Sequence, residues 1–460
     1  MKVLLVRPRL LNFLTVSEAM NCEPLELEYL YTACRQVGVE ARIYDGILET
    51  EKFSKRLISF QPDVVAITLY ITQENVVKKY ISVIRKWLPN CKVILGGVHA
   101  QLNFKRLYFD GVDFVTRSES MSVFQQLLIS IRDHQSFDSI SGLCYRTRSG
   151  FSENGFSPCD ITQLPVPQRP CLKNDGRFRY LDFENVATLK TAVSCPYHCT
   201  FCYGTSLHGG IYQARPISKV IEEIETIPVN TVFIVDSDFL VDESRLRAFI
   251  AGIREKHIHK RYVGRGMSFL DHKRFICYGR ADFIVQHEEL IGELCAVGFS
   301  YFLVGIEGID DWNLCRYKKQ TSKKMNEQCI AVLNRCEATC IALMIADLSF
   351  RIRDFRRLYQ WVKSQPLAYV SLQILTPIPP TRYFLNSRNK LTETRPEKWD
   401  LIHPVQRPQN MPAWFFLFCH RFLSVKLFFL GRKRGAYCFV TFGYVIHALR
   451  SLFRRIGTVR

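Results

Sequence analysis

Short apolar segments alternate with amphipathic segments in two separate stretches of this chain, and this double alternation limits the possible folds most. In the first stretch, segments of strand character span residues 2–6, 40–44, 63–69, 92–95 and 113–116. Helical periodicity separates them, for example over residues 25–37 and 75–88. Strands that alternate with helices at this spacing form a parallel sheet covered on both faces. The sequence therefore predicts a doubly wound, Rossmann-like α/β domain over residues 1–135.

The second alternation follows a looser segment. Residues 136–182 are rich in Gly, Ser, Asn and Pro, which predicts an extended linker. Strand character then returns at residues 188–192, 231–235, 275–278, 302–305, 339–345 and 369–375. Helical patterns lie between them at residues 217–226, 243–255, 288–296 and 323–334. Six successive β/α units predict a partial TIM-type barrel over residues 183–385, with its active site at the carboxyl ends of the strands.

The remaining residues, 386–460, form a basic and aromatic tail that we expect to be helical. No Asp or Glu follows Asp400, whereas the tail carries Arg421, Lys426, Arg432, Lys433, Arg434, Arg450, Arg454 and Arg455. Its aromatic residues include Trp414, Phe415, Phe416, Phe418, Phe428, Phe429, Phe439, Phe442 and Tyr444. Two interpretations stay open: the tail binds a membrane interface, or its aromatic residues close the bottom of the barrel.

The net charge, the first residues and the length of the apolar stretches indicate which partner and which compartment to expect. A net charge of +19 predicts an anionic partner such as a phosphorylated ligand or a membrane surface. The first residues lack the pattern of a signal peptide, and no uninterrupted apolar stretch reaches the ~20 residues that span a bilayer. We therefore expect a cytoplasmic protein, peripheral at most to the inner face of the membrane, whose 17 cysteines stay reduced unless they hold metal.

Three of these cysteines carry a specific chemical signal. Cys195, Cys199 and Cys202 lie on one short segment after the first predicted barrel strand. Three thiolates can hold three irons of a 4Fe-4S cluster and leave the fourth iron open to an exogenous ligand. Zinc is the alternative, but zinc takes four ligands, often from two Cys-x-x-Cys pairs, and the second pair is missing.

The Cys-x-x-x-Cys-x-x-Cys spacing resembles the radical S-adenosylmethionine superfamily. Further segments resemble its motifs in order: Tyr203 beside the third cysteine, residues 212–216 and 220–223 after the cluster loop, Asp236 and Asp238 after the second strand, Arg280 after the third, Glu307 after the fourth, and residues 376–381 after the last. The resemblance implies that the open iron binds the amino and carboxylate groups of S-adenosylmethionine. It also implies that an electron from the cluster yields a 5′-deoxyadenosyl radical.

The front domain and linker resemble the cobalamin-binding branch of that superfamily. The segment Glu23-Pro-Leu-Glu-Leu27 resembles its first helix entry, and Gly96-Gly97-Val98-His99 resembles its fourth-strand exit. The resemblance implies a cobalamin site near Gly96, Gly97, His99, Tyr70 and Thr72, although for His99 we favour a hydrogen-bonded loop histidine over a ligand. Two departures stand out: the Asp-x-His-x-x-Gly motif is absent, and Arg117-Ser-Glu119-Ser120 replaces a glycine-rich stretch.

The resemblance favours methyl transfer to an unactivated carbon of a small molecule, lipid or natural product. It implies a reducing partner such as flavodoxin or ferredoxin, and it makes nucleic acid an unlikely partner. Radical cyclisation or rearrangement is the first alternative. Methylthiolation is a weaker one, because Cys22, Cys34 and Cys91 do not form a second cluster motif. A non-catalytic iron–sulfur redox sensor is the last, kept open by Glu119 and by Asp347 where a glycine-rich exit is common.

Overall fold

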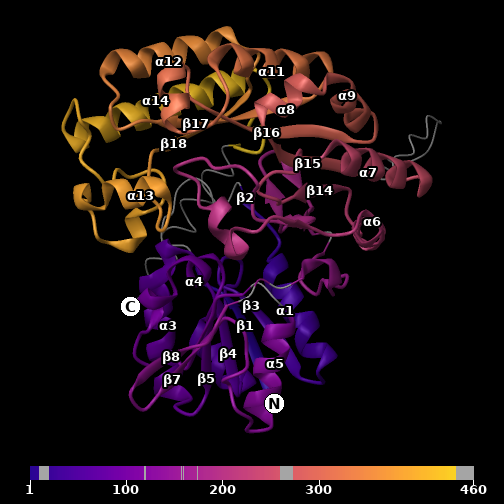
Figure 1. Ribbon diagram of the computed structural model, residues 1–460, viewed down its shortest axis with the longest axis vertical. Coiled ribbons are helices and arrows are strands. Elements are labelled where there is room, and N and C mark those ends of the chain that lie inside the picture. The colour runs from indigo at the N-terminus through magenta and orange to yellow at the C-terminus, as the bar shows by residue number, and fades with distance from the viewer. Residues whose placement is uncertain are drawn as a thin grey trace.

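The computed structural model describes residues 1–9, 20–118, 121–156, 158, 160–173, 175–258 and 273–441. Two α/β bodies lie one above the other, with the indigo and violet front domain below the magenta-to-orange barrel (Figure 1). Both the doubly wound front domain and the partial barrel are as the sequence predicts.

The front domain is built on one sheet with strand order β3-β1-β4-β5-β6-β7-β8. The first five of these strands are parallel and the last two are antiparallel. Their bounds are β1 Lys2–Arg7, β3 Glu40–Asp45, β4 Val64–Thr68, β5 Lys92–Gly96, β6 Phe114–Thr116, β7 Leu143–Thr147 and β8 Gly150–Glu153. The order reverses beside β1, and a reversal of this kind opens a ligand crevice at the carboxyl ends of the strands.

Side chains alternate between the two faces of this sheet, which explains its two helical layers. Val3 and Leu5 pack under one layer, while Leu4 and Val6 pack under the other. The first layer holds α1 Leu25–Gln36 and α5 Met121–Arg132, and the second holds α2 Phe53–Phe60 and α3 Glu74–Trp87. Near the strand ends lie α4 Val98–Asn103, η1 Ile71–Gln73 and η2 Phe104–Leu107.

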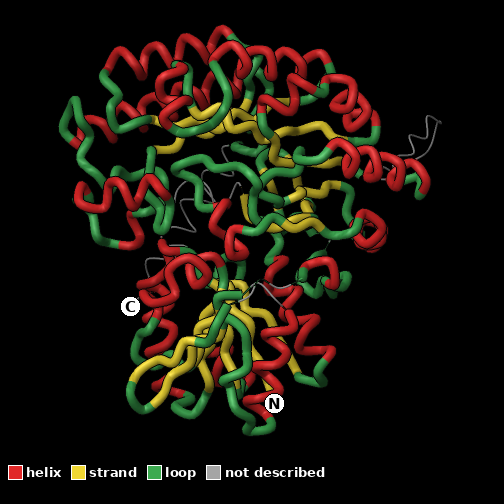
Figure 2. Tube along the Cα trace, in the orientation of Figure 1, coloured by secondary structure: helices red, strands yellow, loops and turns green. Residues whose placement is uncertain are grey.

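The barrel consists of six parallel strands in sequence order, with helices on the outside (Figure 2). The strands are β11 Val186–Leu189, β14 Thr231–Ile234, β15 Arg274–Gly279, β16 Phe299–Glu307, β17 Thr339–Ala346 and β18 Tyr369–Ile374. Each predicted strand overlaps an observed one. The first begins two residues earlier than predicted, at Val186, and the fourth starts three residues earlier, at Phe299.

The helices around the barrel close most of its outer surface. They are α6 Ile217–Thr226, α7 Glu243–Glu255, α8 Ala281–Gln286, α9 Glu288–Ala296, α10 Asp311–Arg316, α11 Lys323–Arg335, α12 Ile352–Ser364, α13 Arg382–Ser387 and α14 Ala413–Lys433. Short 3-10 segments are η3 Ile161–Gln163, η4 Gly204–Gly210, η5 Arg388–Lys390 and η6 Pro396–Lys398. Helix α14 packs against the edge strand β18 and against α12 (Figure 1).

The linker differs from the prediction. Residues 143–153 form the hairpin β7–β8, which pairs with β6 and extends the front sheet. Sequence periodicity missed this hairpin because two short strands with exposed polar side chains resemble a loop in composition. The end of the linker forms β9 Arg179–Tyr180, which pairs with β10 Phe183–Glu184 at the start of the predicted barrel segment and with β2 Met20–Asn21 in a small sheet between the domains. A second small sheet pairs β12 Ala192–Val193 with β13 Gln213–Ala214.

A buried arginine from the linker ties the two domains together. Arg169 contacts the carboxylates of Glu23 at 2.7 Å and Glu223 at 2.5 Å. Glu23 also accepts a hydrogen bond from the backbone N–H of Thr188, in the first barrel strand, at 2.8 Å. Glu23 therefore connects the start of α1, the linker and the barrel, which explains why the segment before α1 carries a glutamate.

Candidate cofactor site and active site

One cavity of about 1160 Å³ joins the two domains. On the front-domain side it is lined by the carboxyl ends of β4, β5 and β6, and on the barrel side by residues that follow the barrel strands. It continues through the barrel interior to Tyr369 on β18 and to Ser424 and Phe428 on α14. Both predicted cofactor regions therefore open into the same space.

The cysteine loop lies on the barrel wall of this cavity. Cys195, Cys199 and Cys202 all line it, after the short strand β12. Burial, with smaller contributions from Asp238 and the two other thiols, raises the pKa of Cys195 to about 12. Burial also raises the pKa of Cys202, with a contribution from Cys199. The three sulfur atoms are thus close enough to influence one another, as the spacing predicts.

A zinc ion and a 4Fe-4S cluster require different arrangements of the cysteine thiols. Among the residues that the structure describes, no group of three or more His, Cys, Asp or Glu side chains converges on a point suited to one metal ion. A zinc ion needs its ligand atoms at ~2.0–2.3 Å from one centre. A cubane cluster instead takes each thiolate on a different iron, so its ligands stand apart. The three thiols of the loop match in number the three irons that a 4Fe-4S cluster with one open iron offers to protein ligands.

Asp236 holds the strand that leads into the cysteine loop. Its carboxylate accepts hydrogen bonds from the backbone N–H groups of Thr191 at 2.7 Å and Ala192 at 3.0 Å, and from the Thr191 hydroxyl at 2.5 Å. Burial raises the pKa of Asp236, and these hydrogen bonds oppose that shift. Because its oxygens are used in this way, Asp236 positions the loop.

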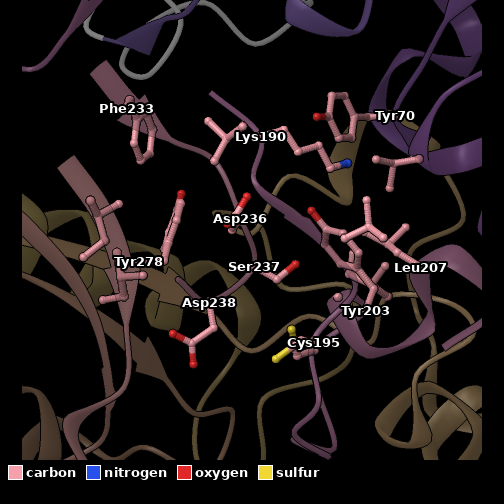
Figure 3. A pocket seen from close by; sticks show the side chains of 18 of the residues that line it. Tyr70, Lys190, Cys195, Tyr203, Leu207, Phe233, Asp236, Ser237, Asp238 and Tyr278 are labelled. Carbon is pink, nitrogen blue, oxygen red and sulfur yellow. The ribbon is translucent and has the colours of Figure 1, made fainter. Parts of the chain in front are cut away.

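Asp238 is in a different situation two residues later. Its side chain is 3% exposed and lines the cavity. One carboxylate oxygen accepts the Leu240 N–H at 3.1 Å, and the other, Oδ2, is buried without a partner. Burial raises the pKa of Asp238 to about 7. Figure 3 shows Asp238 and Cys195 on the same side of the cavity. An unpartnered buried carboxylate facing a cavity fits a cationic group of a ligand.

Arg280 and Glu307 end the next two strands, as predicted. Arg280 donates to Asp282 at 2.9 Å and to the Lys319 carbonyl at 2.6 Å, and its Nη1 lies 3.9 Å from the Cys199 sulfur. Glu307 accepts a hydrogen bond from Lys319 Nζ at 3.1 Å. A positively charged group therefore lies beside one of the three cysteines of the loop.

On the front-domain side, three of the residues predicted to contact cobalamin line the cavity. Tyr70, Gly96 and Gly97 line the cavity, and Tyr70 is 53% exposed toward it. Gly97 has φ +89, and a Cβ there would lie 2.4 Å from the Thr68 hydroxyl. Glycine is therefore needed at 97 for the fold of the strand exit itself, and it leaves bare backbone at the cavity wall.

Two predicted residues do not lie in the cavity lining. His99 is 2% exposed, and its ring contacts Glu74 at 2.8 Å, so it is a buried, hydrogen-bonded histidine. Thr72 lies in η1 outside the lining. Helix α4 starts immediately after Gly97 and turns His99 inward, which residue spacing did not reveal. Glu119 and Ser120 lie outside the described residues.

The structure brings in residues that sequence reasoning missed. Lys319 reaches Glu307 from the segment after α10, and Lys190 follows β11 into the cavity near Tyr70 (Figure 3). Asp347 accepts a hydrogen bond from the Tyr317 hydroxyl at 2.5 Å and pairs with Arg316. The Tyr317 carbonyl in turn accepts the Thr200 N–H at 3.0 Å. Asp347 stands where a glycine-rich exit is expected, and it supports the cysteine loop through Tyr317. No local pattern in the sequence predicts this contact.

Comparisons with known proteins agree with this architecture. The family model of the B12 binding domain matches residues 12–128. Hopanoid C-3 methylase of Methylococcus capsulatus is 25% identical over 417 residues, which cover 90% of this chain and 77% of that protein. Anaerobic magnesium-protoporphyrin IX monomethyl ester cyclase of Synechocystis is 22% identical over 80% of this chain and 76% of its own length.

A solved structure shows the same fold. The cobalamin-dependent S-adenosylmethionine radical enzyme OxsB, with aqua-cobalamin and S-adenosylmethionine bound, superposes with a TM-score of 0.71 at 14% identity. The match covers 93% of this chain and 66% of that one. A B12 binding domain precedes a partial barrel, and the barrel carries the three-cysteine loop beside a shared cavity. The chain therefore matches a B12 binding domain in its front part and shares, over 93% of its length, the fold of a cobalamin-dependent S-adenosylmethionine radical enzyme.

Proposed function

We propose that this enzyme transfers a methyl group to an unactivated carbon of a small-molecule or lipid substrate. The observation that carries the proposal is the shared cavity, which places the cysteine loop on one wall and the exits of β4 and β5 on another. When bound, the 4Fe-4S cluster, S-adenosylmethionine and cobalamin supply a hydrogen-abstracting radical and a methyl group.

The residues of the cavity fit these groups. Cys195, Cys199 and Cys202 would hold the cluster, and Arg280 Nη1 lies 3.9 Å from the Cys199 sulfur. Asp238 would accept the ammonium group of S-adenosylmethionine, because its free oxygen is the unpartnered buried acceptor on that wall. Glu307 and Lys319 form the adjacent polar wall, and Tyr203 lines the passage toward the front domain.

On the opposite wall, Gly96, Gly97 and Tyr70 would contact cobalamin. The protein's own contribution is to align the reacting groups and to keep water away from them. The lining supports this role, because Phe233, Leu303, Ile341 and Leu343 make the barrel interior apolar. An apolar interior also supports an apolar substrate.

The partners follow from the same chemistry. A flavodoxin or ferredoxin would reduce the cluster in the cytoplasm. The basic tail supports contact with an anionic membrane at the inner face. The similarity to a hopanoid methylase supports a lipid as substrate.

A spectroscopic and product assay tests the proposal. After anaerobic reconstitution with iron and sulfide, the protein should absorb in the charge-transfer region of iron–sulfur clusters and form 5′-deoxyadenosine under reductant. Cys199→Ala should lose both signals. The matched control is Cys336→Ala, because Cys336 lies between α11 and the amino end of β17, whereas the cysteine loop lies at the carboxyl ends of the barrel strands. A Cys199→Ala protein that retains both signals would exclude the assignment.

A second candidate is radical cyclisation, which the similarity to the Synechocystis cyclase supports. S-adenosylmethionine with a deuterated methyl group separates the two reactions. Methyl transfer places deuterium in the product, whereas cyclisation yields an unlabelled product together with 5′-deoxyadenosine.

A further inference from the structure

Helix α14 has two faces of different character. One face packs into the protein through Phe416, His420, Leu423, Leu427 and Gly431. His420 Nε2 lies 3.1 Å from the Leu372 carbonyl of β18, so this face is fixed to the edge of the barrel. The opposite face points to solvent.

The solvent face carries a continuous apolar ridge. Its members are Trp414, Phe418, Phe422, Val425 and Phe429, which are 71%, 58%, 58%, 51% and 60% exposed. Successive spacings of four, four, three and four residues place them in one line along the helix. The Phe418 and Phe422 rings stack with centroids 6.1 Å apart. A contiguous exposed ridge of this kind marks a docking surface.

Basic side chains border the ridge. Arg421, Arg432 and Lys433 are exposed on α14. Lys426 lies 3.8 Å from the Tyr359 ring of α12 and 5.8 Å from the Phe422 ring. Lys426 therefore connects the aromatic ridge to the neighbouring helix.

Helix α12 continues the positive surface. Arg356 and Lys363 are exposed and lie three residues before and four residues after Tyr359, so they share its face. Asp354 is the single acidic residue of α12, which carries four basic ones, and no Asp or Glu follows Asp400 in the sequence. An anionic surface complements this positive charge. The exposed faces of α12 and α14 carry no cluster of acidic side chains that would repel such a surface.

By length and composition α14 could cross a bilayer, and it is the one such helix among the described residues. Crossing would require α14 to leave β18 and to break the contact of His420 with Leu372. A helix with one face held by protein and the other aromatic and edged by Arg and Lys is suited instead to lie in the plane of the interface.

We propose that α14 and α12 dock this enzyme on an anionic lipid bilayer, with the aromatic ridge inserted among the lipids. The cavity reaches Ser424 and Phe428 of the same helix, so its far end lies close to the docked surface. A lipid substrate would enter beside α14 and travel through the barrel interior toward the cysteine loop. The proposed docking surface is inferred from the geometry and charge of α12 and α14, whereas the proposed path of a lipid substrate rests on the proposed function.

Vesicle sedimentation with the full-length reconstituted enzyme tests the docking surface. Vesicles of phosphatidylcholine and phosphatidylglycerol in equal parts should bind the enzyme, and binding should fall at high salt. The triple variant Phe418→Ser, Phe422→Ser, Phe429→Ser should bind at least about tenfold more weakly, because three large apolar side chains no longer enter the lipid. Trp87→Ser with Ile58→Ser removes exposed apolar residues of the front domain and serves as the matched control.

A second variant tests the positive charge of α12 separately from the aromatic ridge of α14. Arg356→Glu with Lys363→Glu should weaken binding to the anionic vesicles at least about tenfold. Lys52→Glu with Lys55→Glu changes the charge equally on the front domain and should bind as the unaltered enzyme does. Equal binding by the unaltered enzyme and the ridge variant overturns the proposal. So does failure of the unaltered enzyme to bind, or a ridge-dependent dimer without vesicle binding.

Sedimentation needs no turnover, so the two proposals fail separately. Vesicle binding without 5′-deoxyadenosine formation would count against the proposed function alone. Turnover on a dissolved substrate without vesicle binding would count against the docking surface alone.

Discussion

At the scale of single residues, the site contains two aspartates that look alike in sequence and differ in role. Asp236 has its oxygens occupied by Thr191 and Ala192, while Asp238 keeps one buried oxygen without a partner. Both side chains line the cavity, and the difference arises because only the Asp236 carboxylate reaches the backbone beside β12. A buried, unpartnered carboxylate costs folding free energy, and such a cost is typical of ligand sites.

Asp238→Asn should therefore separate stability from binding. Without ligand, the variant should melt at the same temperature as the unaltered enzyme or higher, because a buried charge is removed. Its dissociation constant for S-adenosylmethionine should rise about tenfold or more through loss of a charge-assisted hydrogen bond. Calorimetric melting and equilibrium binding measure the two effects. A variant that is less stable but binds normally would assign Asp238 to the fold alone.

At the scale of elements, the cysteine loop depends on a segment more than one hundred residues later. Thr200 donates its N–H to the Tyr317 carbonyl, and Phe201 packs edge-on against the Tyr317 ring at 5.3 Å. The Tyr317 hydroxyl is anchored to Asp347 at the end of β17. The loop is thus held by the strand exits on the far side of the barrel.

Tyr317→Phe should loosen this support without removing the ring. The lost hydrogen bond to the buried Asp347 carboxylate corresponds to about 1.5–3 kcal/mol. We expect the cluster to assemble but to be lost several-fold faster in the presence of a chelator, followed as decay of its absorbance. Tyr108→Phe, which removes a hydroxyl bonded to the exposed Glu153, should leave the rate unchanged. Equal rates for all three proteins would refute the support role.

The attachment of α14 predicts a pH dependence. Burial, with smaller contributions from the neighbouring Arg421 and His403, lowers the pKa of His420 to about 4. Because the folded-state pKa lies below the unfolded value of ~6.5, the unfolded chain binds a proton first, and stability falls as pH drops below ~6.5. The expected loss between pH 7 and pH 5 is about 2 kcal/mol. His420→Gln should flatten this part of the melting-temperature profile, and an unchanged slope would contradict the assignment.

At the scale of the whole molecule, the position of the two domains depends on a buried ionic cluster. Arg169 contacts Glu23 and Glu223, while Arg215 pairs with Glu223 at 2.6 Å and donates to the Tyr29 hydroxyl at 3.2 Å. Residues of α1, the linker and α6 meet there, so the cluster fixes the width of the shared cavity. The cost of burying these charges is offset only while every partner is present.

Arg169→Met should destabilise the enzyme by about 3–5 kcal/mol, since Glu23 and Glu223 would lose their buried partner. We expect a lower melting temperature together with weaker retention of cobalamin, because the walls of the cavity come from both domains. Arg177→Met is the control, as its pair with Asp175 is largely exposed and contributes at most about 1 kcal/mol. Equal melting temperatures for the two variants would exclude the role of Arg169 in holding the two domains together.

The sequence by itself determined the two β/α alternations and the three-cysteine spacing. Both depend on local order: periodicity along strands and helices, and thiols on one short loop. It also placed Asp238, Arg280 and Glu307 at strand ends, which a parallel barrel gathers on one side. The resemblance carried by these motifs led to the fold and the cofactors that the comparisons support.

Only the tertiary structure decided which of these residues face the cavity. Periodicity could not show that His99 turns inward to Glu74, or that Lys319 and Asp347 support the site from other units of the barrel. It also left the tail undecided: the structure shows that one face of α14 packs on the barrel edge and that the other is exposed, whereas contact of the exposed face with a membrane stays a prediction. The physical reason is that facing and burial depend on contacts between residues distant in the chain, which local patterns do not contain.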